Sequence, residues 1–159
     1  MSERGASAPD KNVILLGIGH TNAHVIKEWA TDPIPGCRLT CVSKFPTSTY
    51  SGMLPGTLGR QFEDDEMRVP LQQLVDQAGA ELVIADASGI NLERGELIFA
   101  DRESIPFSVM SIGVGSMPIG WHEHSDCSNL VAIKPMQTFL SRLHACLDSA
   151  ITRQPERVR

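Results

Sequence analysis

The sequence predicts an α/β fold built on a parallel sheet, and three features carry this prediction. A continuous apolar run over residues 12–18 is typical of a strand that is buried on both faces. An amphipathic segment over residues 20–32 follows, and a β-rich segment over residues 38–43 comes next. A strand, a helix and a second strand so close together form a βαβ unit. The 159 residues suffice for one domain with a sizeable core.

The helix over residues 20–32 should begin near Thr21 and end before Pro33, because proline disfavours helical backbone in the residue before it. Residues 44–62 are dense in glycine, proline, serine and threonine, and they predict a long loop with one helical turn. Long loops in compact domains often carry function. This loop is therefore a candidate part of a binding site.

The second half of the chain predicts further strands, a small antiparallel insertion and two helices. A short amphipathic helix over residues 68–79 has Pro70 in its first turn and Gly79 as its stop. The other expected elements are a strand over 80–92, a hairpin over 91–107 that turns at 93–96, a strand over 107–115 and an amphipathic helix over 134–153. Together these elements predict three layers.

Composition excludes several classes of protein. Hydrophobic residues make up 42% of the chain and charged residues 21%, as in soluble globular proteins. The net charge of −5 argues against a nucleic-acid partner. No apolar stretch is long enough to span a bilayer, and residues 1–11 predict a disordered leader rather than a secretory signal. Four cysteines without a C-x-x-C pair predict reduced thiols in the cytoplasm, with Cys37 and Cys41 on one face of a strand.

The turn between the first strand and the first helix reads G-x-G-x-x-N, from Gly17 to Asn22. In a dinucleotide-binding turn, the first glycine allows a sharp exit from the strand and the second, here Gly19, lets a pyrophosphate approach the backbone. The N–H groups at the helix start then bind the anion. Asn22 replaces the usual third glycine and either tilts the helix or bonds a phosphate oxygen. An ordinary strand-to-helix turn is the alternative interpretation.

The end of the second strand departs from the dinucleotide-binding pattern, which places an acidic residue there for the ribose hydroxyls. Ser43 occupies that position, and no aspartate or glutamate is adjacent. Ser43 can still make one hydrogen bond to a ribose hydroxyl, whereas Lys44 favours a phosphate.

Two histidine-containing segments invite a metal-site interpretation. His20 and His24 are four residues apart, which is the spacing of two metal ligands on one helix face. No glutamate of an H-E-x-x-H pattern lies between them, and no third ligand is obvious. We therefore expect packing roles and no metal. Residues 121–126 (WHEHSD) are expected to form a solvated loop.

Three segments together resemble a known family: VILLGIGHTNAHVI (13–26), LTCVSKFPTSTYSGMLPG (39–56) and PFSVMSIGVGSMP (106–118). Residues 12–151 resemble the pyridine-nucleotide-disulfide oxidoreductase superfamily of flavoproteins. The chain is most similar to the type II NADH dehydrogenase-like branch, which includes proteins fused to selenide, water dikinase. The resemblance implies a Rossmann-like FAD/NAD(P)-binding fold that is incomplete here. Residues 12–151 would be the N-terminal part of an FAD-binding domain, and residues 152–159 a tail leading to an absent NAD(P)H-binding domain.

The resemblance also implies which residues hold FAD. The glycine turn and helix start would bind the pyrophosphate, the end of the second strand would lie near the adenosine ribose, and residues 85–87 would pass the adenine. Residues 50–55 would approach the flavin or ribityl chain, and residues 113–115 would meet the cofactor again. The expected binding residues are Gly17, Gly19, His20, Thr21, Asn22, Ser43, Lys44, Tyr50, Ser51, Gly52, Met53, Pro55, Ala85, Asp86, Ala87, Gly113, Val114 and Gly115. No catalytic acid or base is expected.

The function implied is a flavin-dependent NAD(P)H dehydrogenase that passes electrons to a quinone or similar acceptor. The parent protein would be cytoplasmic or peripheral at a membrane, and this chain alone is expected to be inactive. The alternative is a non-catalytic nucleotide-binding or regulatory Rossmann module. The expected partner is the small-molecule cofactor, together with a second copy of the chain paired through an exposed sheet edge.

Overall fold

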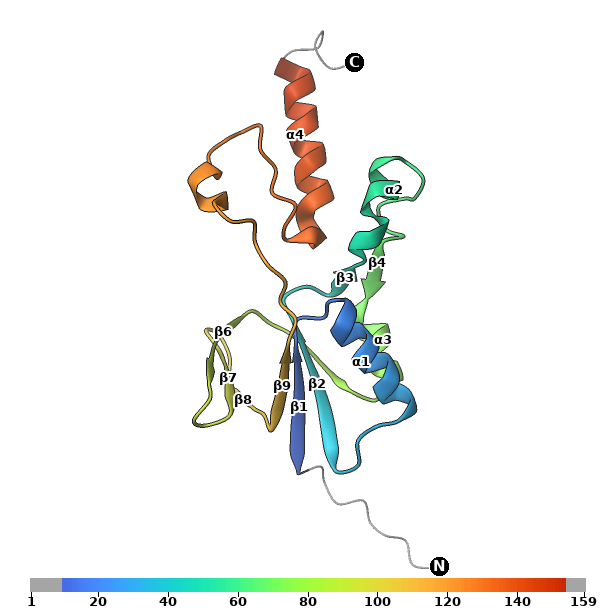
Figure 1. Cartoon of the computed structure of the whole chain (residues 1–159), viewed down its shortest axis with the longest axis vertical. Coiled ribbons are helices and arrows are strands. Elements are labelled where there is room, and N and C mark those ends of the chain that lie inside the picture. The colour runs from blue at the N-terminus through green and yellow to red at the C-terminus, as the bar shows by residue number, and fades with distance from the viewer. Residues whose placement is uncertain (1–9, 154–159) are drawn as a thin grey trace, which may run out of the picture. The chain divides into compact units, whose positions relative to one another are not determined.

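The computed structural model describes residues 10–153, which form two compact units (Figure 1). Residues up to 48 and residues 69–115 make up the first unit. Residues 49–68 and the residues from 116 onward make up the second. The predicted leader falls mostly on residues 1–9 and the predicted tail mostly on 154–159, which lie outside the described part.

The first unit is organised around a parallel four-stranded sheet, as the sequence predicts. Its strands are β1 (Lys11–Leu16), β2 (Cys37–Ser43), β5 (Glu81–Ile84) and β9 (Val109–Ile112), in the order β5-β2-β1-β9. The helix α1 (His20–Thr31) connects β1 to β2 and completes the predicted βαβ unit. It starts at His20, one residue before the predicted start near Thr21, and it ends before Pro33 as predicted.

The strand register brings four chain segments to one edge of this sheet. Leu16, the last residue of β1, is level with Val42 of β2 and with Ile112 of β9. Ser43 at the end of β2 is level with Ile84 at the end of β5. Residues that follow these four strands therefore gather at the carboxyl edge, where ligands bind in open α/β sheets.

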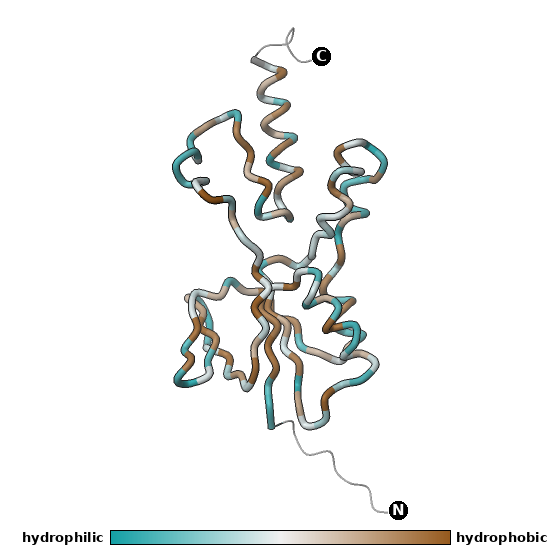
Figure 2. The backbone as a smooth tube through the Cα atoms, viewed as in Figure 1, coloured by the Kyte–Doolittle hydropathy of each residue, from teal (hydrophilic) through white to brown (hydrophobic). Residues whose placement is uncertain are grey.

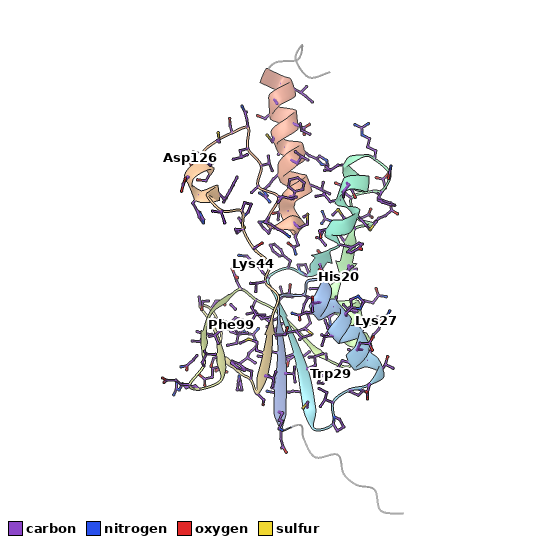
Figure 3. The ribbon with its side chains drawn as sticks, in the orientation of Figure 1. His20, Lys27, Trp29, Lys44, Phe99 and Asp126 are labelled. Carbon is purple, nitrogen blue, oxygen red and sulfur yellow. The ribbon has the colours of Figure 1, made fainter. Side chains whose placement is uncertain are left out.

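The sheet carries a layer on each face, which confirms the predicted three-layer arrangement. On one face α1 and α3 (Leu71–Gln77) cover Leu15 and Cys41, and Trp29 belongs to this core. On the other face lies an antiparallel sheet of β6 (Ala87–Asn91), β7 (Glu96–Phe99) and β8 (Ile105–Pro106). Figure 3 shows Trp29 and Phe99 in these two opposite layers.

Alternation along the strands produces these two cores. Ile14 and Leu16 pack with Val42 and Phe99 against the antiparallel layer, whereas Leu15 between them faces the helices. Figure 2 shows the apolar character of the central strands. Cys37 and Cys41 both pack on the helix side, which confirms that they share one face of β2. Within residues 10–153 all four cysteines are free thiols.

The second unit is smaller and mostly helical. It contains the short helices η1 (Ser51–Met53), α2 (Leu54–Leu58), η2 (Trp121–His124) and η3 (Met136–Thr138), and the longer helix α4 (Phe139–Arg153). Its core consists of Leu54, Met67, Met136, Phe139 and Leu140. The strands β3 (Thr47–Thr49) and β4 (Arg68–Pro70) pair where the chain passes between the units.

Several elements differ from the sequence prediction. The predicted helix over residues 68–79 is shorter, because Pro70 ends the strand β4 and the helix α3 begins at Leu71. The expected single strand over residues 80–92 is two strands, because β5 belongs to the parallel sheet and β6 to the antiparallel one. In the expected loop over residues 44–62, the predicted helical turn is the five-residue helix α2, whereas the strand β3 was not predicted. Lys11, placed in the leader by the sequence, begins β1 and is level with Cys37.

Two further features concern the surface of the chain. None of the helices in the described part is long and apolar enough to cross a membrane. Over residues 10–153, β9 pairs only with β1, and its Val109 and Ile112 side chains are more than half exposed. Association of two copies through this edge stays a prediction.

Candidate functional site

The turn after β1 is held by direct backbone contact with the end of β9. Gly17 has φ +77°, and its N–H donates to the Val42 carbonyl oxygen at 2.8 Å. The N–H of Gly113 donates to the Leu16 carbonyl oxygen at 2.7 Å. A Cβ added at Gly17 would lie 2.6 Å from the Gly113 carbonyl oxygen. The first glycine of the motif is therefore required by the fold itself.

Gly19 differs from Gly17, because the fold does not require a glycine there. Gly19 is the N-cap of α1, with an ordinary φ of −83°, and it is exposed. A Cβ added at Gly19 would lie 3.6 Å from the Gly113 carbonyl oxygen, which is an ordinary van der Waals distance. The bare backbone at Gly19 leaves room for a group outside the chain.

The start of α1 offers an anion-binding end of a twelve-residue helix. Over residues 10–153, no side-chain hydrogen bond caps this helix, and its first turn contains no acidic residue. The Ala23 N–H donates to the Gly19 carbonyl oxygen at 2.9 Å and closes the first helical turn. The positive end of the helix dipole thus faces the carboxyl edge of the sheet, and no acidic side chain in the first turn of α1 neutralises it.

Asn22 is a buried cross-link at this edge, with 2% of its surface exposed. Its Nδ2 donates to the Gly17 carbonyl oxygen at 2.7 Å, and its Oδ1 accepts from Ser111 Oγ at 2.8 Å. The residue thereby joins α1 to the glycine turn and to β9. A bond from Asn22 to a phosphate would compete with these internal bonds, so the geometry favours a positioning role.

The ends of β2 and β5 carry the charged groups of the site. Ser43 is buried, and its Oγ donates to the Phe45 carbonyl oxygen at 2.8 Å and accepts from the Phe45 N–H at 3.2 Å. Lys44 Nζ lies 2.5 Å from Asp86 Oδ2, and both side chains are more than half exposed. Figure 3 shows Lys44 and His20 at the same end of the sheet.

The structure gathers most of the predicted binding residues at the carboxyl edge of the first unit. These are Gly17, Gly19, His20, Thr21, Asn22, Ser43, Lys44, Ala85, Asp86, Ala87, Gly113, Val114 and Gly115. The others, Tyr50, Ser51, Gly52, Met53 and Pro55, belong to the second unit. Their contact with a cofactor stays a prediction.

Two residues that sequence reasoning missed support the turn. No sequence motif singles out Ser111, yet its hydroxyl donates a hydrogen bond to the side chain of Asn22, which lies 89 positions away in the chain. Ser48 Oγ donates to the Ile18 carbonyl oxygen at 2.6 Å and fixes the loop after β2 against the turn. The signal in the sequence was Asn22 at the position of the third motif glycine, because a buried side-chain amide needs hydrogen-bond partners elsewhere in the fold.

The side chains of His20 and His24 lie next to one another on α1. The rings of His20 and His24 meet edge to face, with centroids 4.9 Å apart. In the described part of the chain, no three His, Cys, Asp or Glu side chains gather closely enough to hold a metal ion. The segment 121–126 is mostly the short helix η2, with largely exposed residues, rather than a loop.

Comparisons with solved structures identify the fold. No family model matches the sequence. The sulfide:quinone oxidoreductase of the hyperthermophilic bacterium Aquifex aeolicus matches with a TM-score of 0.62 and 18% identity, over 69% of this chain and 26% of that one. The water-forming NADH oxidase of Lactobacillus brevis, bound to NADH, gives 0.58 and 16%, over 69% and 26%.

A third neighbour is putidaredoxin reductase in its covalent complex with putidaredoxin. Its TM-score is 0.61 and its identity 14%, over 77% of this chain and 31% of that one. The chain thus spans about a quarter to a third of the length of these proteins. At such identities the likeness concerns the fold, and this chain has the Rossmann-like α/β fold that the three oxidoreductases share.

Proposed function

We propose that the first unit binds FAD and is the flavin-holding part of an oxidoreductase. The reaction would take a hydride from NAD(P)H and pass electrons to a quinone or a similar acceptor. Gly19 carries this proposal, because its missing side chain is not explained by the packing of the chain. A pyrophosphate that approaches the backbone explains it. The quinone and NADH in the names of two structural neighbours support the reaction class.

The residues at the carboxyl edge fit the chemistry of a dinucleotide. Backbone N–H groups at the start of α1 would hold the pyrophosphate, because the helix dipole favours negative charge there. Gly115 has φ +79°, and within the described residues a Cβ there would meet nothing within 4 Å. The backbone of residues 113–115 can therefore approach the cofactor closely. Ser43, Lys44 and residues 85–87 would line the adenosine side.

The flavin, when bound, supplies the hydride-accepting chemistry, and the chain supplies binding and orientation. A nicotinamide must lie against the flavin ring for hydride transfer, and the one glycine turn described at the start of α1 would hold one pyrophosphate. We therefore expect the chain alone to bind FAD without oxidising NADH.

Titration of the full chain with FAD, followed by flavin fluorescence, tests the proposal. Gly19→Asp is the informative variant, because aspartate is a good N-cap residue and keeps α1 stable while it places a carboxylate at the anion site. We expect the variant to keep its melting temperature and to lose FAD affinity about tenfold or more. Gly36→Asp adds the same charge in the loop before β2 and should leave affinity unchanged.

Two results would contradict the proposal. The first is a wild-type chain that takes up no flavin. The second is a Gly19→Asp variant that binds FAD as well as the wild type does. Equal affinity for ADP and FAD would instead favour the alternative, a non-catalytic nucleotide-binding module, because the flavin half of the cofactor would then contribute nothing.

A further inference from the structure

We propose that Asp86, held by Lys44, accepts the hydrogen bonds of the adenosine ribose hydroxyls of the bound dinucleotide. The acceptor would thus come from the end of β5, one strand away from the position where a dinucleotide-binding fold usually carries it. This inference rests on the proposed function. It adds a specificity-determining residue and defines the ligand class as a dinucleotide with an unphosphorylated adenosine ribose.

The end of β2 does not supply the acceptor. Ser43 is 8% exposed, and its hydroxyl is engaged with both the N–H and the carbonyl oxygen of Phe45. The following residues, Lys44 to Pro46, include no carboxylate. A ribose at this edge must therefore find its acceptor on another segment.

Asp86 is the carboxylate that the topology brings to this place. The three residues after each strand of the central sheet are 17–19, 44–46, 85–87 and 113–115, and Asp86 is the one acidic residue among them. The Ala85 N–H donates to the Ser43 carbonyl oxygen at 3.0 Å, so the chain after β5 still runs beside the end of β2. Asp86 is the next residue.

The ion pair with Lys44 holds the carboxylate at the edge and leaves it able to accept further bonds. Lys44 Nζ contacts Oδ2 of Asp86, with the two side chains 59% and 67% exposed. A carboxylate has about four acceptor sites, so one ammonium contact leaves capacity for two ribose hydroxyls. At this exposure the pair contributes little to stability. The position of the pair at the carboxyl edge of the sheet is better explained by binding.

The same pair explains why Lys44 does not select a phosphorylated ribose. The nearest carboxylate neutralises the ammonium group and would repel a 2′-phosphate. A free ribose diol, as in FAD, can donate to the carboxylate without such a penalty. The geometry therefore favours FAD over a ligand that carries a 2′-phosphate.

The test compares FAD with an analogue that lacks the 2′-hydroxyl of the adenosine ribose, using flavin fluorescence and the full chain. We expect the wild type to bind FAD more tightly than the analogue. Asp86→Asn should weaken FAD binding about tenfold, which is typical of a lost hydrogen bond to a charged group, and should abolish the difference between the two ligands. Asp76→Asn removes an exposed carboxylate from α3 and should change neither affinity.

Competition with 5′-AMP and 2′,5′-ADP, which differ only by the 2′-phosphate, provides a second readout. The wild type should prefer 5′-AMP, and Asp86→Asn should narrow this preference. An Asp86→Asn chain that is folded by circular dichroism and still discriminates both ligand pairs would overturn the inference while leaving the proposed function intact. A wild-type chain that binds no FAD would overturn both.

Discussion

Asn22 shows how a single residue can alter a motif and still serve the fold. The usual glycine at this position lets a helix and a strand approach closely. Asn22 instead fills the space with an amide whose two polar atoms bond the Gly17 carbonyl oxygen and the Ser111 hydroxyl. The glycine turn, α1 and β9 are thereby held by one side chain.

Replacement of Asn22 by alanine should therefore destabilise the first unit. Two hydrogen bonds are lost and the Ser111 hydroxyl loses its acceptor, so we expect the free energy of unfolding to fall by about 2–3 kcal/mol. Urea denaturation followed by circular dichroism measures this. Thr21→Ala, at the exposed neighbouring position, should cost less than about 0.5 kcal/mol. Equal costs for the two variants would contradict the cross-link.

The buried thiol of Cys41 should make the free energy of unfolding depend on pH in the alkaline range. Burial raises the pKa of its thiol from 9.0 to about 12, because desolvation disfavours the thiolate. Below pH 9 the thiol is neutral in both the folded and the unfolded chain, so it adds no pH dependence. Between pH 9 and 12 only the unfolded chain ionises. The free energy of unfolding should then fall by up to about 1.4 kcal/mol per pH unit.

Denaturant titrations at pH 8, 9, 10 and 11 check this slope. Cys41→Ala removes the thiol and should give a flatter curve than the wild type, whatever its cost at pH 8. The same slope in both proteins would assign the alkaline loss to other groups.

At the scale of elements, Gly17 and Gly36 allow two costs of replacing a glycine to be compared. One is the strain of a positive φ, and the other is the overlap of a Cβ with neighbouring backbone. Both glycines have positive φ, +77° and +74°. A Cβ at Gly17 would overlap the backbone of Gly113, whereas one at Gly36 would meet nothing within 4 Å among the described residues. Gly36→Ala should cost about 1–2 kcal/mol of unfolding free energy from φ alone.

Gly17→Ala should cost clearly more than Gly36→Ala, because the turn must also move away from β9. Thermal and urea denaturation of the two variants measure the difference. If the two costs agree, the contact between the turn and β9 does not constrain the element.

The pattern of apolar residues along the sequence predicted those elements whose formation depends mainly on neighbouring residues. The run before Gly17, the amphipathic α1 and the β-rich β2 agree closely with the sequence prediction. The division of residues 80–92 between two sheets could not be predicted, since Val83 pairs with Val42 while Ile90 pairs with Leu97. Both pairings depend on tertiary context, which overrides β-propensity.

The candidate site shows the same limit. The glycine turn was visible in the sequence, but the Asn22–Ser111 bond joins residues 89 positions apart. The Lys44–Asp86 pair joins residues 42 positions apart, and it follows from the order of strands rather than from any motif. Sequence spacing predicts which groups lie at the edge, whereas topology decides which of them meet.

At the scale of the whole molecule, two units with separate cores predict separate local stabilities. The first unit is stabilised by residues such as Val42, and the second by residues such as Phe139 and Leu140. Phe139→Ala should lower the protection of α4 amides against hydrogen exchange and leave β1 and β2 protected. Val42→Ala should instead lower protection in the central sheet. Loss of protection throughout the chain in both variants would indicate one cooperative core.

We infer that the carboxyl edge of the first unit binds a dinucleotide. Backbone amide NMR of the full chain during FAD titration tests this inference most directly. We expect saturable shifts of the amide signals of residues 17–22, 85–87 and 113–115, with the signals of the loop around Gly36 unchanged. Unchanged signals at the glycine turn, or shifts confined to other segments, would contradict it.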